Sequence, residues 1–151
     1  MRSRWVIVAL ALIAASAFAL SVQGGRWWVV LNVEIGPFGS RRCFADECGR
    51  TGLSWIGAGE GWMRLGMAIW AAGLLSMAIL VVMSAAIAAG KAPRLIAKIG
   101  ISALVTAMLV GALFVAKFPG VDGVSIGRGI PLFGVAIVFG LAAAILTVRR
   151  R

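Results

Sequence analysis

The chain has 151 residues, 62% of which are hydrophobic, with a mean hydropathy of +1.02 and a formal net charge of +10. Soluble domains contain roughly 45–50% apolar residues, so this composition excludes an ordinary soluble globular domain. The length suits a single domain with four membrane-spanning helices of about 20 residues each and one sizeable loop.

Four apolar runs divide the chain, at about residues 5–22, 65–89, 99–116 and 130–148, and none of them contains Asp, Glu, Lys, Arg or His. As a helix, each run is long enough to cross a hydrocarbon layer of about 30 Å. The second run is longer than this requires, so we expect it to tilt or to project beyond the bilayer. The pattern predicts an all-α integral membrane fold, a four-helix transmembrane bundle with a small β-containing extracellular first loop.

The first run has a second interpretation. A basic start, a short apolar stretch and Ala15-Ser16-Ala17 together resemble a secretory signal peptide with its cleavage site. The apolar residues continue past this site to Val22, which favours a retained helix.

The basic residues predict the orientation in the membrane. On one side of the bundle, the tails and one short turn contain only basic charges: Arg2, Arg4, Lys91, Arg94, Lys98, Arg149, Arg150 and Arg151. The other two loops, about residues 23–63 and 117–129, contain all the acidic residues. Because short cytoplasmic segments are rich in Lys and Arg, we expect both termini to be cytoplasmic and both loops to be external. The composition, rich in Ala, Gly and Arg without His or Tyr, suggests a bacterial inner (plasma) membrane.

The stretch RRCFADECGR, Arg41–Arg50, contains the two cysteines of the chain, Cys43 and Cys48. External thiols are normally oxidised, and only one pairing is possible. We predict a structural disulfide, which in the chain-entropy model stabilises such a short loop by roughly 2 kcal/mol. A redox-active pair is the alternative, although such pairs usually have a tighter Cys-x-x-Cys spacing. Zinc requires four ligands, and without His or a third Cys we predict no metal site.

The rest of the first loop also contains structural signals. Arg26–Ile35 is rich in Trp and β-branched residues and predicts a strand, and Gly36–Ser40 predicts a turn. The tryptophans are either anchors at the membrane interface or the core of a small extracellular sheet: Trp27, Trp28, Trp55 and Trp62. We expect the glycine-rich second loop to pack beside the first.

Each predicted helix has small residues at a spacing of four, which allows helix backbones to approach closely in lipid. The stripes are Ala11, Ala15 and Ala19; Ala68, Ala72 and Ser76; Ala103, Ala107 and Gly111; and Ala136, Gly140 and Ala144. We expect close helix packing, centred on Ala15, Ala72, Ala107 and Gly140.

The usual features of catalysis and transport are missing from the sequence. The apolar runs lack the ionisable residues that form proton relays and ion paths. The chain has no His, the commonest general base and haem ligand, and no Gly-rich phosphate-binding loop. We therefore predict no enzymatic activity and no cofactor. The scattered basic residues favour anionic lipid of the bilayer as a partner, and not nucleic acid.

The predicted architecture resembles the claudin and peripheral-myelin-protein superfamily of tetraspan proteins. That family has four helices, both ends inside, and a large first loop with a β-strand, a Trp, a Gly-Leu-Trp motif and two bridged cysteines. An Arg often begins its second helix. Here Trp27 or Trp28 matches the first Trp, Cys43 and Cys48 match the cysteines, and Arg64 matches the Arg.

The match departs from the family pattern within the loop. Gly36-Pro37-Phe38 stands in place of Gly-Leu-Trp, the two cysteines are closer together, and the more similar Gly52–Trp55 comes after them. The predicted helix topology resembles that of the family over the whole chain, whereas the sequence motif is matched only between Trp27 and Arg64. It implies adhesion, barrier or scaffolding roles through the external loop.

Three functions follow from these patterns. The first is a non-enzymatic tetraspan whose external loop binds a protein partner or a second copy. The second is an accessory subunit of a larger respiratory or transport complex, packed through its small-residue helix faces. The third is a membrane thiol-disulfide oxidoreductase, although known quinone-linked enzymes generally need a second cysteine pair. For the first function, the expected contact residues are Trp27, Trp28, Phe38, Arg41, Arg42, Asp46, Glu47 and Trp55.

Overall fold

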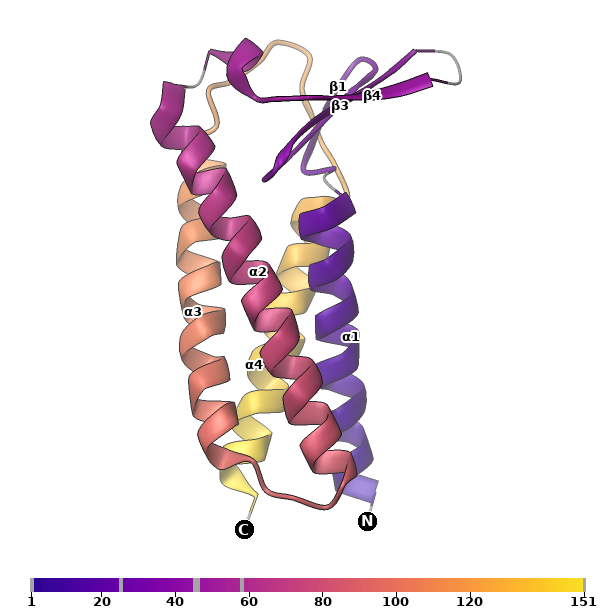
Figure 1. Ribbon diagram of the computed structural model, residues 1–151, viewed down its shortest axis with the longest axis vertical. Helices are drawn as coiled ribbons and strands as arrows, with labels where there is room; N and C mark the ends of the chain where they lie inside the picture. The colour runs from indigo at the N-terminus through magenta and orange to yellow at the C-terminus, as the bar shows by residue number, and fades with distance from the viewer. Residues whose placement is uncertain (1, 25, 45–46, 58, 151) are drawn as a thin grey trace.

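A computed structural model describes residues 2–24, 26–44, 47–57 and 59–150 of the chain. Its four long helices are α1 (Arg2–Gly24), α2 (Gly59–Ala88), α3 (Arg94–Ala116) and α4 (Gly129–Arg149). They form an up-and-down bundle in which α1 and α3 each pack against both α2 and α4 (Figure 1). The two termini and the turn between α2 and α3 lie at one end of the bundle, and a small sheet lies at the other.

Each helix is long and apolar enough to cross a membrane. The helices cover the four predicted apolar runs and continue into the polar residues that flank them, so α2 begins at Gly59 and the first loop is shorter than predicted. With 30 residues, α2 is roughly 45 Å long at 1.5 Å per residue. It crosses the bundle obliquely in Figure 1.

The sheet contains five antiparallel strands in the order β4-β3-β2-β1-β5. Four strands come from the first loop: β1 (Trp28–Val30), β2 (Val33–Gly36), β3 (Gly39–Phe44) and β4 (Glu47–Thr51). The short helix η1 (Ser54–Ile56) connects β4 to α2. From the second loop, β5 (Ser125–Ile126) pairs with β1 and places Ile126 opposite Trp28. The expectation that the second loop packs beside the first is therefore confirmed.

The strand predicted over Arg26–Ile35 is a hairpin, so that prediction is wrong in detail. Val30 pairs with Val33 across a two-residue turn at Leu31 and Asn32. Leu31 has a φ of 51°, in the left-handed region that residues other than glycine seldom adopt. With no Gly or Pro to mark the turn, the β-branched residues on both sides resemble one continuous strand. The turn predicted at Gly36–Ser40 is confirmed by the pairing of Gly36 with Gly39.

Small residues lie at three of the helix crossings, as the stripes predict. Ala15, Ala107 and Gly140 are buried inside the bundle of this single chain. An added Cβ at Gly140 would lie 3.0 Å from Cδ2 of Leu104 and 3.4 Å from Cδ1 of Leu80. Gly140 therefore allows the side chains of Leu104 on α3 and Leu80 on α2 to pack against the backbone of α4.

The stripe predicted for α2 is misplaced around the helix. Ala68 is exposed and Ala72 is only half-buried, so Ser76 is the one predicted member that is buried. The buried face of α2 runs instead through Gly66, Gly73 and Leu80. At Gly73, an added Cβ would lie 2.7 Å from Cγ1 of Val22, so glycine and not alanine brings α1 and α2 together. Alanine is so abundant that its spacing alone does not identify the buried face.

Candidate partner-binding surface

A cluster of aromatic side chains joins the sheet to the bundle. Trp28 stacks on Phe118 with ring centroids 4.3 Å apart, and Trp62 stacks on Phe114 at 4.6 Å. Trp27 contacts Phe114 at 5.7 Å, and Phe133 extends the cluster on α4. The rings come from the first loop, from Phe118 in the second loop and from the sheet-side ends of α2, α3 and α4. The apolar face of the sheet is therefore buried against the end of the helix bundle.

Trp27 is also bound through its polar groups. Its indole N–H donates to the carbonyl oxygen of Ser21 in α1 at 3.1 Å. Its backbone N–H donates to Ile35 and its carbonyl accepts from Gly127, both at 2.8 Å. The Ser21 hydroxyl donates to the carbonyl of Gly129 at 2.8 Å. These bonds fasten the end of α1, the sheet and the start of α4 to one another.

The tryptophans divide into buried and exposed members. Trp27 and Trp28 are only 1% and 4% exposed, and Trp62 is equally buried. The prediction that Trp27 and Trp28 contact a partner is therefore wrong, because the junction already covers both side chains. The alternative of a tryptophan core is confirmed for these three. Trp55 differs, since its ring is half-exposed and its indole N–H donates to the Ser40 hydroxyl at 2.9 Å.

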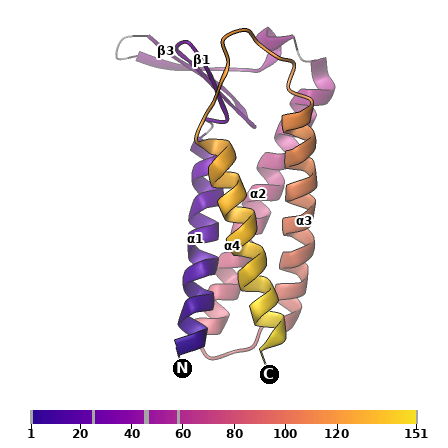
Figure 2. The same cartoon turned by 180° about the vertical axis from the view of Figure 1, so that it is seen from behind.

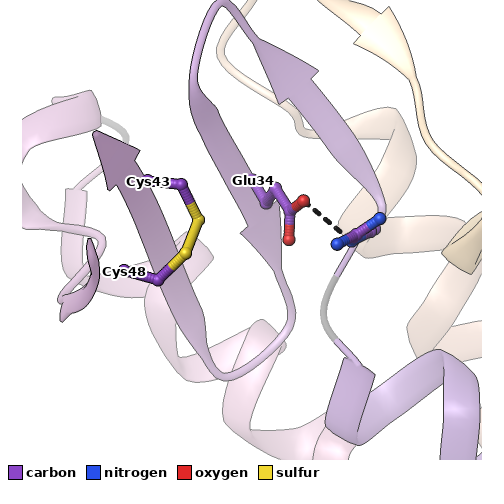
Figure 3. Close-up of polar contacts among 4 residues, drawn as sticks. Glu34, Cys43 and Cys48 are labelled. Atoms are coloured by element: carbon purple, nitrogen blue, oxygen red, sulfur yellow. Dashed lines mark ion pairs between the residues drawn. A yellow bond between two sulfur atoms is a disulfide. The ribbon is translucent and has the colours of Figure 1, made fainter. Parts of the chain in front are cut away.

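The outer face of the sheet is basic. Successive side chains of a strand point to opposite faces, and the row of Trp28, Ile35 and Ser40 is buried against the bundle. The neighbouring row therefore points outward, with Glu34 opposite Arg41 and Arg41 opposite Arg50. Arg41 and Arg50 are exposed. Glu34 forms an ion pair of 2.8 Å with Arg26 (Figure 3).

The predicted disulfide is present. Cys43 and Cys48 lie opposite one another on β3 and β4 and are bonded (Figure 3). The bond lies near the end of the hairpin formed by these strands, which extends sideways beyond α1 (Figures 1 and 2). Glu47, next to Cys48, is exposed. Asp46, another predicted contact residue, lies outside the described residues.

Exposed aromatic side chains lie elsewhere on the hairpin, because Arg42 and Phe44 alternate with Arg41 and point to the opposite face of the sheet. Phe44 is 65% exposed, and the Arg42 guanidinium carbon lies 5.5 Å from the centroid of its ring. Phe38 is exposed on one side and stacks on Trp70 of α2 with ring centroids 4.9 Å apart. Both faces of the projecting hairpin are therefore exposed, with Arg41 and Arg50 on one face and Arg42, Phe44 and Glu47 on the other. We call the exposed side chains of this region the hairpin surface: Phe38, Arg41, Arg42, Phe44, Glu47, Arg50 and Trp55.

Sequence reasoning missed Phe44 and Arg50 as members of this surface. Both belong to the Arg41–Arg50 stretch that the sequence singled out. The signal available was period-two alternation around the two cysteines, which places side chains in rows once the hairpin is recognised.

No protein-family model matches the sequence, and no curated protein is significantly similar to it.

Proposed function

We propose that this chain is a non-enzymatic membrane protein whose hairpin surface binds a protein partner outside the membrane. The observation that carries the proposal is the division of the sheet into two parts. Its base is buried on the bundle, whereas the hairpin of β3 and β4 projects exposed Arg and aromatic side chains. Arg and aromatic residues are enriched where proteins bind one another.

The charge of the hairpin surface indicates the chemistry of the partner. Arg41, Arg42 and Arg50 outnumber Glu47 on the described part of the hairpin. Complementary charge increases the rate and the specificity of association. We therefore propose a partner with an acidic surface, either another protein or an acidic patch on a second copy.

The proposal includes insertion in a membrane, with the sheet outside and both termini in the cytoplasm. Four apolar helices support it. The termini and the turn that contains Lys91 lie at one end (Figure 1), so the basic segments group as the orientation requires. A disulfide at the other end suits an oxidising compartment, such as the space outside a bacterial inner membrane.

Orientation can be tested with single cysteines at exposed positions, in a background where Cys43 and Cys48 are Ser. We expect Asp122→Cys, in the second loop, to react with an impermeant thiol reagent in intact cells. Ala92→Cys, in the opposite turn, should react only after permeabilisation. Labelling of Ala92→Cys in intact cells would contradict the proposed orientation.

A relationship to the claudin superfamily belongs to the same proposal. The disulfide joins neighbouring strands of the first loop, and Trp27 and Trp28 lie at the base of that loop. Arg64 lies in the second turn of α2 and pairs with Glu60 at 3.2 Å. From this resemblance we propose a role in adhesion, a barrier or scaffolding.

Partner binding is tested by crosslinking intact cells and identifying the proteins attached to the chain. We expect the double variant Arg41→Glu/Arg50→Glu to lose a partner that the wild type captures. Arg64→Glu, an exposed change at the same end of the bundle, is the matched control and should retain it. Unchanged capture by the double variant, with its disulfide intact, would refute binding through the hairpin surface.

A second candidate function is that of an accessory subunit, favoured by a groove between α2 and α3. The groove has a volume of about 400 Å³ and is lined by Ala72, Leu75, Ile79, Ile99, Ser102, Ala103 and Thr106. Small and hydroxyl side chains are typical of helix contacts in membranes. We expect Ala103→Leu to release a subunit bound there from a mild-detergent complex. Purification of the wild type without any stoichiometric partner would argue against this function.

A further inference from the structure

A second groove lies between the sheet-side halves of α3 and α4. It has a volume of about 570 Å³, and its lining is entirely apolar, including Met108, Gly111, Ala112, Gly134 and Val138. Seen from behind, the two helices separate toward the sheet (Figure 2). Trp27 lines the groove from the base of the sheet. The groove is therefore open to the side of the bundle and bordered by Trp27 at the sheet end.

An acyl chain suits this groove better than a helix does. The volume falls in the range of about 300–1,000 Å³ that is typical of small-molecule sites. A straight helix lying along the groove would meet Trp27 at its sheet-side end, whereas a flexible chain can enter from the side. In a membrane, the side of the bundle faces acyl chains. The side chains of this lining are apolar, apart from the indole N–H of Trp27, which is already bonded to Ser21.

Two basic residues lie where the groove meets the sheet. Lys117 directly follows Ala116, which lines the groove, and Arg128 precedes the lining residue Ile130 by two positions. Both are exposed, and neither forms an ion pair within the described part of the chain. Asp122 is the acidic residue of the same loop. Here α3 ends and α4 begins, so the helix dipoles oppose one another and the side chains determine the local charge.

We propose that the groove holds an acyl chain of an anionic phospholipid, and that Lys117 and Arg128 bind its phosphate. Basic pockets between transmembrane helices bind anionic headgroups, and hydrogen bonds between Lys or Arg and phosphate are charge-assisted. The lipid site rests on the membrane insertion proposed above and is independent of partner binding by the hairpin surface.

The test is native mass spectrometry of the full chain after reconstitution in nanodiscs with equal phosphatidylglycerol and phosphatidylcholine. We expect the wild type to retain phosphatidylglycerol preferentially, by about fivefold for each basic residue, which corresponds to ~1 kcal/mol. Lys117→Gln/Arg128→Gln should still retain lipid but without preference. Equal retention of the two lipids by the wild type would refute headgroup recognition.

Filling the groove tests the acyl-chain site separately. An added Cβ at Gly134 meets no atom within 4 Å, so Gly134→Phe should occupy the groove without disturbing the bundle. We expect it to lower retention of both lipids severalfold. Ala68→Phe, at an exposed position on α2, is the matched control and should leave retention unchanged. Equal retention by these two variants would overturn the groove site, whereas extraction of the wild type from membranes by alkali would refute insertion instead.

Discussion

Gly66 of α2 is a position where the turn between β2 and β3 lies directly against the bundle. An added Cβ would overlap with the carbonyl oxygen of Pro37 and lie 3.2 Å from Cε2 of Phe114. Pro37 is fully buried in the turn between β2 and β3. Because the obstacle is backbone and not a flexible side chain, Gly66→Ala should force the sheet away from α2.

The expected loss of stability follows from two opposing effects. Overpacking a close contact destabilises by about 1–3 kcal/mol, and a backbone obstacle places this change at the upper end. Replacing glycine by alanine inside a helix stabilises by about 1 kcal/mol. The net destabilisation should therefore be about 2 kcal/mol. Gly61→Ala is the matched control, because it lies on the same helix and its Cβ meets nothing within 4 Å.

Thermal unfolding in detergent, followed by tryptophan fluorescence, measures this difference. Trp27, Trp28 and Trp62 lie at the junction of sheet and bundle, so their emission should report its separation. We expect Gly66→Ala to unfold at a lower temperature than the wild type, and Gly61→Ala at the same or a higher one. If Gly66→Ala were as stable as Gly61→Ala, the close packing of the sheet on α2 would be refuted.

Three further substitutions test the sheet and the bundle. Leu31→Gly should raise the free energy of unfolding by about 1 kcal/mol in a denaturant titration, because it relieves the left-handed backbone; a decrease would contradict the strained turn. Gly140→Leu should destabilise the helix bundle by at least about 1–3 kcal/mol, because the new side chain overlaps with neighbours on α2 and α3. Val138→Leu is the control and should melt at the wild-type temperature, because the Val138 side chain is 62% exposed. Replacing Cys43 and Cys48 with Ser should destabilise the hairpin by about 2 kcal/mol without affecting membrane insertion. Two freely alkylated thiols in unreduced wild-type protein would contradict a stable disulfide.

The bundle could be predicted from the sequence because the signal for each helix is local. Long runs without charge admit few structures other than a helix that is buried or crosses a membrane. The disulfide could also be predicted from the sequence, since Cys43 and Cys48 are the only two cysteines in the chain. The face of α2 that is buried could not be predicted from the sequence, because it depends on which residues pack against Gly66 and Gly73. Those neighbours are Pro37 and Val22, far away in sequence.

The site was harder to predict, because a tryptophan in an external loop suits a core, a membrane interface or a partner contact. Only the tertiary contacts of Trp27 and Trp28 with Phe114 distinguish these roles. The pairing of β5 with β1 depends in the same way on the meeting of two loops that are distant in the chain. The exposed Arg41 and Arg50 could be recognised as charged residues, but not as neighbours in one row before the register of β3 and β4 was known.

The structure gives a physical reason for a disulfide in the β3–β4 hairpin. The base of the sheet is held by Trp28 and Ile35, which are buried on the bundle. Every described residue of β4 is exposed, so this strand has little apolar burial of its own, and an isolated hairpin is at best marginally stable in water. The bond between Cys43 and Cys48 supplies the restraint that burial does not. Exposed Arg and aromatic side chains can then project beyond the bundle on an ordered hairpin, which lowers the entropy lost when a partner binds.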